Sequence, residues 1–139
     1  MCRLIALILL LAAGTAFAAS DIPCPAQLNT AQHLPQVESG WELSSLPWPQ
    51  RLNGIALFDG PPGEGAELKP EFFGGKDPLR ASWNLDRANP RGYWLQCRYD
   101  GTRLVLSRRI EPAPARCEAY FNPAVRIGGT AEILRFGCR

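Results

Sequence analysis

The chain has 139 residues, with 15 basic and 13 acidic side chains, five cysteines and one histidine. This length fits one ordinary domain. No two cysteines have C-x-x-C spacing and His33 is the sole histidine, so a zinc site is excluded and no metal or other cofactor is expected.

The first 18 residues are predicted to be a secretory signal peptide. Arg3 provides the positive start, residues 4–13 are apolar and uncharged, and Ala16 and Ala18 are small residues of the kind that signal peptidase recognises. The apolar run is shorter than the ~20 residues of a membrane span. Cleavage after Ala18 would leave one exported domain, residues 19–139.

A lipoprotein is the alternative to a soluble product, because Cys24 lies close to the cleavage point. A lipidated cysteine must become the first mature residue and follow a small residue, whereas Pro23 and Ile22 precede Cys24. We therefore expect a soluble periplasmic or secreted protein, with no stable membrane insertion after cleavage.

Four cysteines remain in the exported domain, and an even number in an oxidising compartment predicts two disulfides. If the strands follow a simple meander, Cys97 and Cys117 would lie ~10 Å apart, beyond the ~7 Å that a disulfide allows. Cys117 begins one predicted strand and Cys138 follows another, so antiparallel pairing would bring these two together. We predict the pairs Cys24–Cys97 and Cys117–Cys138.

Proline and glycine residues, 13 of each, divide the chain into short segments that suit strands better than long helices. The predicted fold is mainly β, a small antiparallel sandwich or partly open barrel. The alternative is α+β, with one short peripheral helix formed from a helical turn within residues 27–37. Residues 60–65 are expected to form a loop. The predicted strands, in chain order, are residues 41–46, 55–58, 80–85, 92–99, 103–110, 116–121 and 131–136.

The strongest local pattern is a β-hairpin around Asp100 and Gly101. Asp-Gly favours the positive φ angles of a two-residue turn, which would place Cys97 opposite Leu104. The alternation of apolar and polar residues on both sides of the turn indicates half-buried strands. The next strand, residues 116–121, is expected beside the second hairpin strand.

Charge is distributed unevenly along the chain. Residues 19–79 contain three basic and eight acidic residues, net −5, whereas residues 80–139 contain eleven arginines and five acidic residues, net +6. Arginine binds carboxylates and phosphates through a planar fork. One interpretation is a binding face for an anionic envelope component or protein; the other is that the acidic half packs against the basic half. The candidate binding arginines are Arg98, Arg103, Arg108 and Arg109.

No catalytic motif stands out. His33 lacks a recognisable neighbouring nucleophile and is interpreted as a surface residue. Glu64, Glu67 and Glu71 could form a carboxylate pair of a small hydrolase, but they lie in or beside a loop where acidic residues are usually solvated. The aromatic residues do not interleave with the arginines as in an RNA-binding surface, so no nucleic-acid partner is expected.

Three of the four tryptophans, Trp41, Trp48 and Trp83, lie outside the predicted hairpin. Trp41 and Trp83 lie in predicted strands and are expected in the core. Trp48 stands between Pro47 and Pro49, which hold it in a stiff extended segment. It is either an exposed anchor for a partner or a lid over one end of the core.

A series of short motifs runs along the chain. They are Cys24-Pro25, Gly40-Trp41-Glu42, Leu57-Phe58-Asp59-Gly60-Pro61-Pro62, Leu68-Lys69-Pro70, Tyr93-Trp94-Leu95-Gln96-Cys97-Arg98-Tyr99 with Gly101-Thr102, and Leu106-Ser107-Arg108. Together they resemble a family of small uncharacterised exported proteins of proteobacteria. This resemblance implies a periplasmic or secreted domain and carries over no catalytic residue.

Residues 97–102 are also faintly similar to a strand and turn of small periplasmic lysozyme inhibitors, although their inhibitory loop motif is not evident. The sequence therefore favours a non-enzymatic binding or interaction module with an Arg-rich face and Trp48 as an anchor. The alternatives are a small envelope hydrolase that uses carboxylates and an inhibitor of an envelope hydrolase. A structural envelope component that oligomerises through a strand edge is a third hypothesis.

Overall fold

A computed structural model describes residues 24–73 and 79–139, so the predicted signal peptide lies outside the described residues. The described chain forms nine strands and one turn of 3-10 helix. These elements are β1 (Gln27–Leu28), β2 (Gln50–Asp59), η1 (Pro62–Glu64), β3 (Glu67–Leu68), β4 (Glu71–Phe73), β5 (Leu79–Asn84), β6 (Tyr93–Tyr99), β7 (Val105–Ile110), β8 (Arg116–Ile127) and β9 (Thr130–Cys138).

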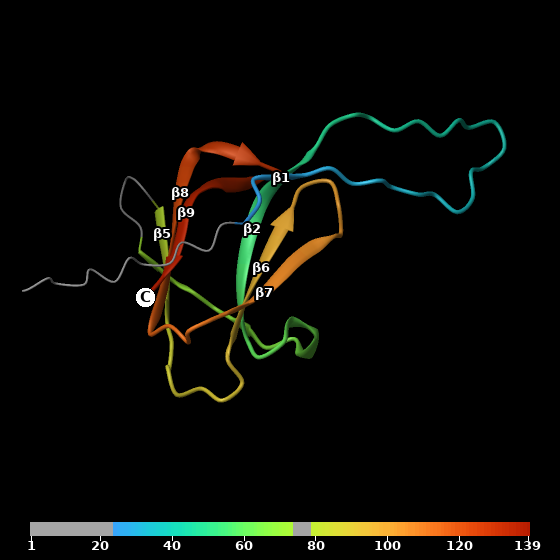
Figure 1. The fold of residues 1–139 in the computed structure, drawn as a ribbon. Coiled ribbons are helices and arrows are strands. Elements are labelled where there is room, and N and C mark those ends of the chain that lie inside the picture. The colour runs from blue at the N-terminus through green and yellow to red at the C-terminus, as the bar shows by residue number, and fades with distance from the viewer. Residues whose placement is uncertain (1–23, 74–78) are drawn as a thin grey trace, which may run out of the picture.

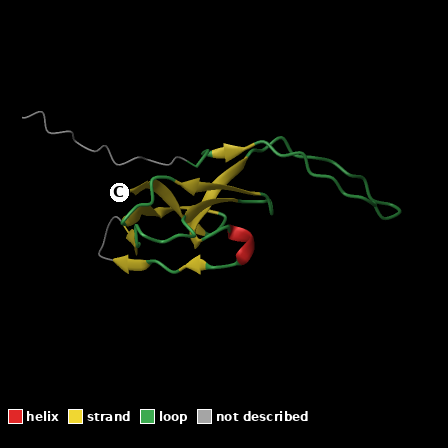
Figure 2. Cartoon of the chain, turned by 60° about the horizontal axis from the view of Figure 1, so that its bottom comes forward, coloured by secondary structure: helices red, strands yellow, loops and turns green. Residues whose placement is uncertain are grey.

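The strands form two antiparallel sheets (Figures 1 and 2). The first has the order β1-β2-β6-β7, with β3 also paired to β2, and the second has the order β4-β5-β8-β9. One of the sheets curves into a half-barrel. The predicted mainly β fold is confirmed; we call these two sheets the body.

The core lies between the sheets and follows from strand alternation. In β6, every second residue from Tyr93 to Tyr99 is buried, and the residues between them are partly exposed. Leu95 joins Leu57 from the first sheet, both fully buried, and Trp83 and Phe136 come from the second sheet. The rings of Trp83 and Phe136 meet edge to face, with centroids 6.2 Å apart. Trp83 is therefore in the core, as predicted.

The predicted disulfides Cys24–Cys97 and Cys117–Cys138 are both present. Cys117 and Cys138 are direct partners in the β8–β9 pair, as predicted. The meander argument, however, is wrong: β8 does not lie beside β7 but pairs with β5 and β9 in the other sheet. The chain changes sheets in the segment between β7 and β8.

The hairpin prediction is correct in its strands and wrong in its turn. Cys97 lies opposite Leu106, not Leu104, because β7 begins only at Val105. Asp100 has no positive φ; its N–H donates to Arg51 O at 2.9 Å, which commits it to β2. The two-residue shift preserves which side chains share a face, since strand alternation has a period of two.

The tight two-residue turn lies instead between β8 and β9. Ile127 pairs with Thr130, and Gly128 and Gly129 have φ of 55° and 84°, as a two-residue hairpin turn requires. A Cβ on Gly128 would lie 2.5 Å from Asp100 Oδ1 and 2.8 Å from Asn53 Nδ2. This turn therefore packs closely on the first sheet, which joins the two sheets at this end.

Two other predictions are wrong. Residues 41–46 form no strand, and the helical turn within residues 27–37 is absent, because this stretch contains only β1 followed by irregular chain. Consequently Trp41 is not in the core but is 75% exposed. Residues 60–65 form a loop as predicted, with η1 as its single turn of helix.

Candidate functional site

Between β1 and β2 the chain leaves the body as a long hairpin-shaped excursion, residues 29–49, here named the arm (Figure 1). Its two ends are fixed to the first sheet, because β1 pairs with β2 at Gln27–Arg51 and Leu28–Gln50. The Cys24–Cys97 disulfide holds the chain just before β1 onto β6. The arm thus departs from a fixed base.

Tyr99 adds a second attachment beneath the arm. Its hydroxyl donates to Pro25 O at 3.0 Å, and burial raises the pKa of this phenol above its ordinary value of 10.0. At the base of the arm, the Gln32 amide donates to Gly101 O at 3.0 Å, and the Thr30 hydroxyl donates to Gln50 Oε1 at 2.8 Å.

Beyond its base the arm lacks regular hydrogen bonding. Its one recorded internal backbone bond runs from Trp41 N–H to Glu38 O at 3.2 Å, at the tip where Gly40 has φ of 88°. Pro35, Pro47 and Pro49 provide no N–H donors for a ladder between the two legs. The arm is irregular throughout, and the predicted strand at residues 41–46 is absent.

The arm carries six of the twelve large apolar side chains that are exposed within the described residues. Trp48 is 70% exposed, so of its two interpretations the exposed residue is correct and the core lid is wrong. Leu46 is 74% exposed and Trp41 is 75% exposed. The other exposed apolar residues of the arm are Leu34, Val37 and Leu43.

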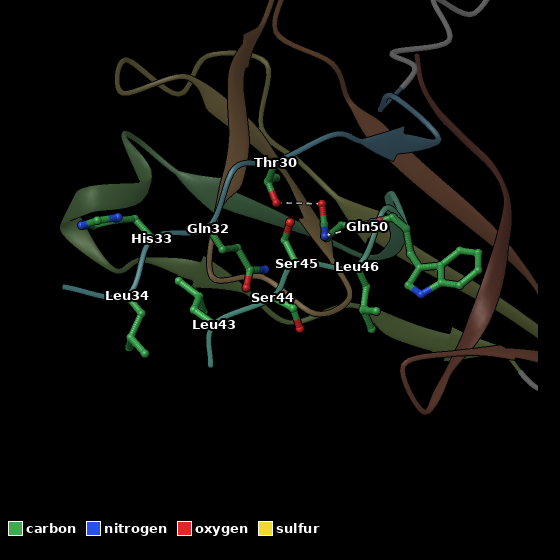
Figure 3. Close-up of a pocket in the computed structure, with 10 residues that line it drawn as sticks. Thr30, Gln32, His33, Leu34, Leu43, Ser44, Ser45, Leu46 and Gln50 are labelled. Atoms are coloured by element: carbon green, nitrogen blue, oxygen red, sulfur yellow. Dashed lines mark hydrogen bonds between the residues drawn. The ribbon is translucent and has the colours of Figure 1, made fainter. Parts of the chain in front are cut away.

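A shallow groove of about 670 Å³ separates the two legs of the arm near its base. Figure 3 shows polar side chains, including Gln32 and Ser45, between the legs, with His33 at the outer end and turned away from them. His33 is exposed, in agreement with its interpretation as a surface residue. Within residues 24–73 and 79–139, no group of three or more His, Cys, Asp or Glu residues could hold a metal ion.

The four candidate binding arginines do not share one face. Arg98 and Arg109 lie opposite Val105 and Trp94 on the outer face of the first sheet, whereas Arg108 lies opposite the buried Leu95. Arg103 precedes β7, in the connection from β6, and lines a second depression beside His33 and Leu104. The strand register separates what looked like a cluster in the sequence.

Two of these arginines are engaged in ion pairs. Arg98 contacts Glu67 at 2.8 Å and Arg109 contacts Glu111 at 3.3 Å. For Arg103 and Arg108 the described part of the chain shows no such partner. Contacts between the acidic and the basic half, such as Arg98–Glu67, support the interpretation that the two halves pack together.

The loop at residues 60–65 is organised around Arg91. This side chain pairs with Glu64 and with Asp59, and its Nη2 donates to Asp59 O at 3.0 Å. Its guanidinium covers Gly60, where a Cβ would lie 2.7 Å from Nη2. Glu64 and Glu67 therefore each face a different arginine and do not converge as a hydrolase would need.

A buried ionic cluster closes the end of the second sheet that holds the Cys117–Cys138 disulfide. Glu118 is 8% exposed and accepts contacts from Arg116 at 3.0 Å, Arg139 at 3.2 Å and Arg80 at 3.8 Å. All four side chains come from or adjoin β5, β8 and β9, so the buried Glu118 links these three strands through arginines that are 32–64% exposed.

A family model for the Type VI secretion system Tli immunity protein matches residues 47–139. The chain belongs to this family. The matched residues, about two thirds of the chain, run from Pro47 through β9 and include the Cys117–Cys138 disulfide. No curated protein and no solved structure matches the chain.

The Tli immunity family match divides the molecule at the arm. The body from β2 onward, together with Trp48, lies within the match; β1, Cys24 and most of the arm precede it. The family and the two disulfides fit a location in the cell envelope. Within the part of the chain that the structure describes, no helix has the length and apolar character to cross a membrane.

The sequence pointed to Trp48 as either an exposed anchor or a lid, and it missed the exposure of Trp41, Leu43 and Leu46 because it placed residues 41–46 in a strand. The signal that could have found them is the set of prolines at 35, 47 and 49, which removes backbone donors from both legs. In this Tli family member, half of the exposed large apolar residues of the described chain therefore lie in one irregular segment.

Proposed function

We propose that this protein is a non-enzymatic immunity protein that binds and inhibits a Tle lipase effector of a type VI secretion system. The observation that carries the proposal is the family match over residues 47–139. Members of the Tli immunity family bind their cognate Tle effector. Of the functions that the sequence left open, inhibition of an envelope hydrolase is therefore favoured over anion binding and over hydrolysis.

The geometry supports binding and gives no support to catalysis by the candidate carboxylates. Glu64 and Glu67 are occupied by Arg91 and Arg98, and η1 orders the loop that carries Glu64. A partner protein, in contrast, could use the exposed apolar residues of the arm together with Arg103 and Arg108. We retain Arg98, Arg109 and Trp48 as further candidate contacts. Arg98 and Arg109 already form exposed ion pairs, so we place them at the edge of the interface, where exchanging one ion-pair partner for another costs little free energy.

The proposed site of action is the periplasm. Export by a signal peptide cleaved after Ala18 would deliver residues 19–139 as a single domain to the compartment where the two disulfides form and persist. Mass spectrometry of the protein isolated from the cell envelope tests this proposal: the expected N-terminus is Ala19 with no free thiol.

The direct test of the function is an inhibition assay with purified components. Oxidised protein comprising residues 19–139 is added to its cognate Tle effector, and hydrolysis of phospholipid vesicles is followed. We expect activity to fall in proportion to added protein and to vanish near equimolar amounts. An unrelated lipase serves as the control and should stay active. Full effector activity at excess immunity protein, with no complex by gel filtration, would overturn the proposal.

A further inference from the structure

We propose that the arm is the element that selects the effector, and that it does so by inserting its apolar side chains into the apolar substrate cleft of the lipase. This inference rests on the proposed function and assigns the contact surface within it. The partner is thus a protein cleft that accepts acyl chains, occupied by Trp41, Leu43, Leu46 and Trp48.

Exposed apolar surface is concentrated in the arm, whose 21 residues carry six of the twelve exposed large apolar side chains of the described chain. A single aromatic side chain buries ~150–250 Å² when it is covered, so the two exposed tryptophans alone offer several hundred Å². Exposed apolar surface of this extent within one segment often marks an interaction site. Tryptophan is also enriched among residues that dominate binding energy.

The base of the arm is fixed to the body, whereas the side chains along the rest of the arm are open to solvent. The Cys24–Cys97 disulfide, the β1–β2 pairs and the Gln32–Gly101 hydrogen bond hold the base. A protruding segment with fixed ends can enter a concave site, and its fixed base lowers the conformational entropy lost on binding. A flat sheet face could not reach into such a site.

The charge of the arm also indicates which kind of partner it meets. The arm contains Glu38 and Glu42 and no lysine or arginine, whereas segments that lie on anionic membranes carry basic residues. An acidic tip therefore disfavours an anionic bilayer as the occupant. Arg103, at the base of the arm, has the opposite charge and suits an acidic rim at the cleft mouth.

The position of the arm relative to the family match also bears on its role. The matched region begins at residue 47, so Trp41, Leu43 and Leu46 precede it while the body from β2 onward lies inside it. An element outside the shared body is suited to distinguish one effector from another. The exposed residues Leu104, Val105 and Leu106 continue the surface beside the arm base, because Gly101 contacts Gln32.

The experiment compares two double variants of the oxidised protein, W41A/L46A in the arm and F72A/L134A in the body. All four side chains are 57–75% exposed, so both variants should fold like the wild type, which urea unfolding checks. Isothermal titration calorimetry with the cognate Tle effector measures Kd. We expect W41A/L46A to bind at least about 100-fold more weakly, as for two central interface residues, and F72A/L134A to bind within about twofold of wild type.

The outcomes separate this inference from the proposed function. If wild type binds and inhibits the effector but W41A/L46A does so equally well, the arm is not the selecting element, although the immunity function stands. If wild type does not bind the effector at all, the proposed function fails first. Wild type that cosediments with phosphatidylglycerol vesicles through Trp41, or dimerises through the arm in analytical ultracentrifugation, would assign the arm to another occupant and overturn the inference.

A second variant tests the charge argument. Arg103→Glu leaves the apolar arm intact, so we expect slower association with the effector and a weaker dependence of the rate on salt. Exposed Arg87, in the connection between β5 and β6, provides the matched control as Arg87→Glu. Equal association rates for the two variants would remove Arg103 from the interface.

Discussion

The body and the arm are held in place by different means. In the body, two sheets bury a core that includes Leu57 and Leu95 at 0% exposure, and two disulfides close its ends. The arm has one recorded internal backbone hydrogen bond and leaves Trp41 at 75% exposure. The difference teaches that this small domain keeps the residues that stabilise it apart from those available for recognition.

The most disruptive change to the body is loss of a disulfide. Cys24 and Cys97 are separated by 73 residues and Cys117 and Cys138 by 21, so the chain-entropy model gives stabilities of about 4.4 and 3.4 kcal/mol. We expect C24A/C97A to lose more free energy of unfolding in urea than C117A/C138A. The reverse order would show that native-state packing around Cys117 outweighs loop closure.

Loss of the buried carboxylate should be the next largest effect. Glu118→Gln removes the carboxylate that Arg80, Arg116 and Arg139 share. Because these arginines are 32–64% exposed, the expected loss is that of a hydrogen bond to a charged group, about 1.5–3 kcal/mol. The matched control is Glu111→Gln, because Glu111 pairs with Arg109 at an exposed position and should change the unfolding free energy by less than ~1 kcal/mol. Equal effects of the two variants would contradict a structural role for the Glu118 cluster.

The hairpin turn gives a smaller effect that isolates one contact. Gly128→Ala forces a methyl group against Asp100 and Asn53, whereas Gly129→Ala meets nothing within 4 Å. Both substitutions strain a positive φ, at about 1 kcal/mol. Thermal unfolding should show a lower Tm for Gly128→Ala than for Gly129→Ala. If the two Tm values agree, the turn does not pack on the first sheet as described.

A modest pH effect should come from Tyr99 under the arm. Because burial raises its folded-state pKa above 10.0, the unfolded chain loses this proton first as pH rises. The contribution of the protonated Tyr99 phenol to the unfolding free energy is complete below pH ~10 and is lost as the pH rises through the raised pKa. We expect the unfolding free energy of Tyr99→Phe to fall less steeply between about pH 9.5 and 11 than that of wild type. Parallel slopes would contradict this.

The smallest expected effect on stability belongs to the arm. Trp48→Ala and Trp41→Ala remove exposed side chains, so the unfolding free energy should change by no more than ~0.5 kcal/mol. Urea unfolding followed by far-ultraviolet circular dichroism provides the measurement. A loss above ~2 kcal/mol for either variant would mean that the arm folds against the body and is not a free element.

The fold was largely predictable because two signals can be read directly from the sequence. These are the alternation of apolar and polar residues along a strand and the even number of cysteines in the exported domain. β6 shows the strict alternation from Tyr93 to Tyr99, and the order of Cys117 and Cys138 along antiparallel strands fixed their pairing. The switch of the chain from the first sheet to the second was not predictable, because nothing near Pro112 or Pro114 distinguishes a third meander strand from a crossover.

The candidate site was less predictable, for two physical reasons. Residues 41–46 have the composition of a strand. They have no strand to pair with, and the prolines of the arm lack backbone N–H donors, so Trp41 and Leu46 stay in solvent. The four candidate arginines are close together in the sequence and therefore appeared to form a cluster. The strand register directs Arg108 and Arg109 to opposite faces of one sheet.

Hydrogen–deuterium exchange of the protein, free and in complex with its cognate Tle effector, tests the division between body and arm most directly. In the free protein, amides of residues 31–48 should exchange fastest, since few of them are hydrogen bonded. In the complex, we predict strong protection across these residues and little change in β5, β8 and β9. An arm that still exchanges freely in a complex that protects only the body would contradict the account.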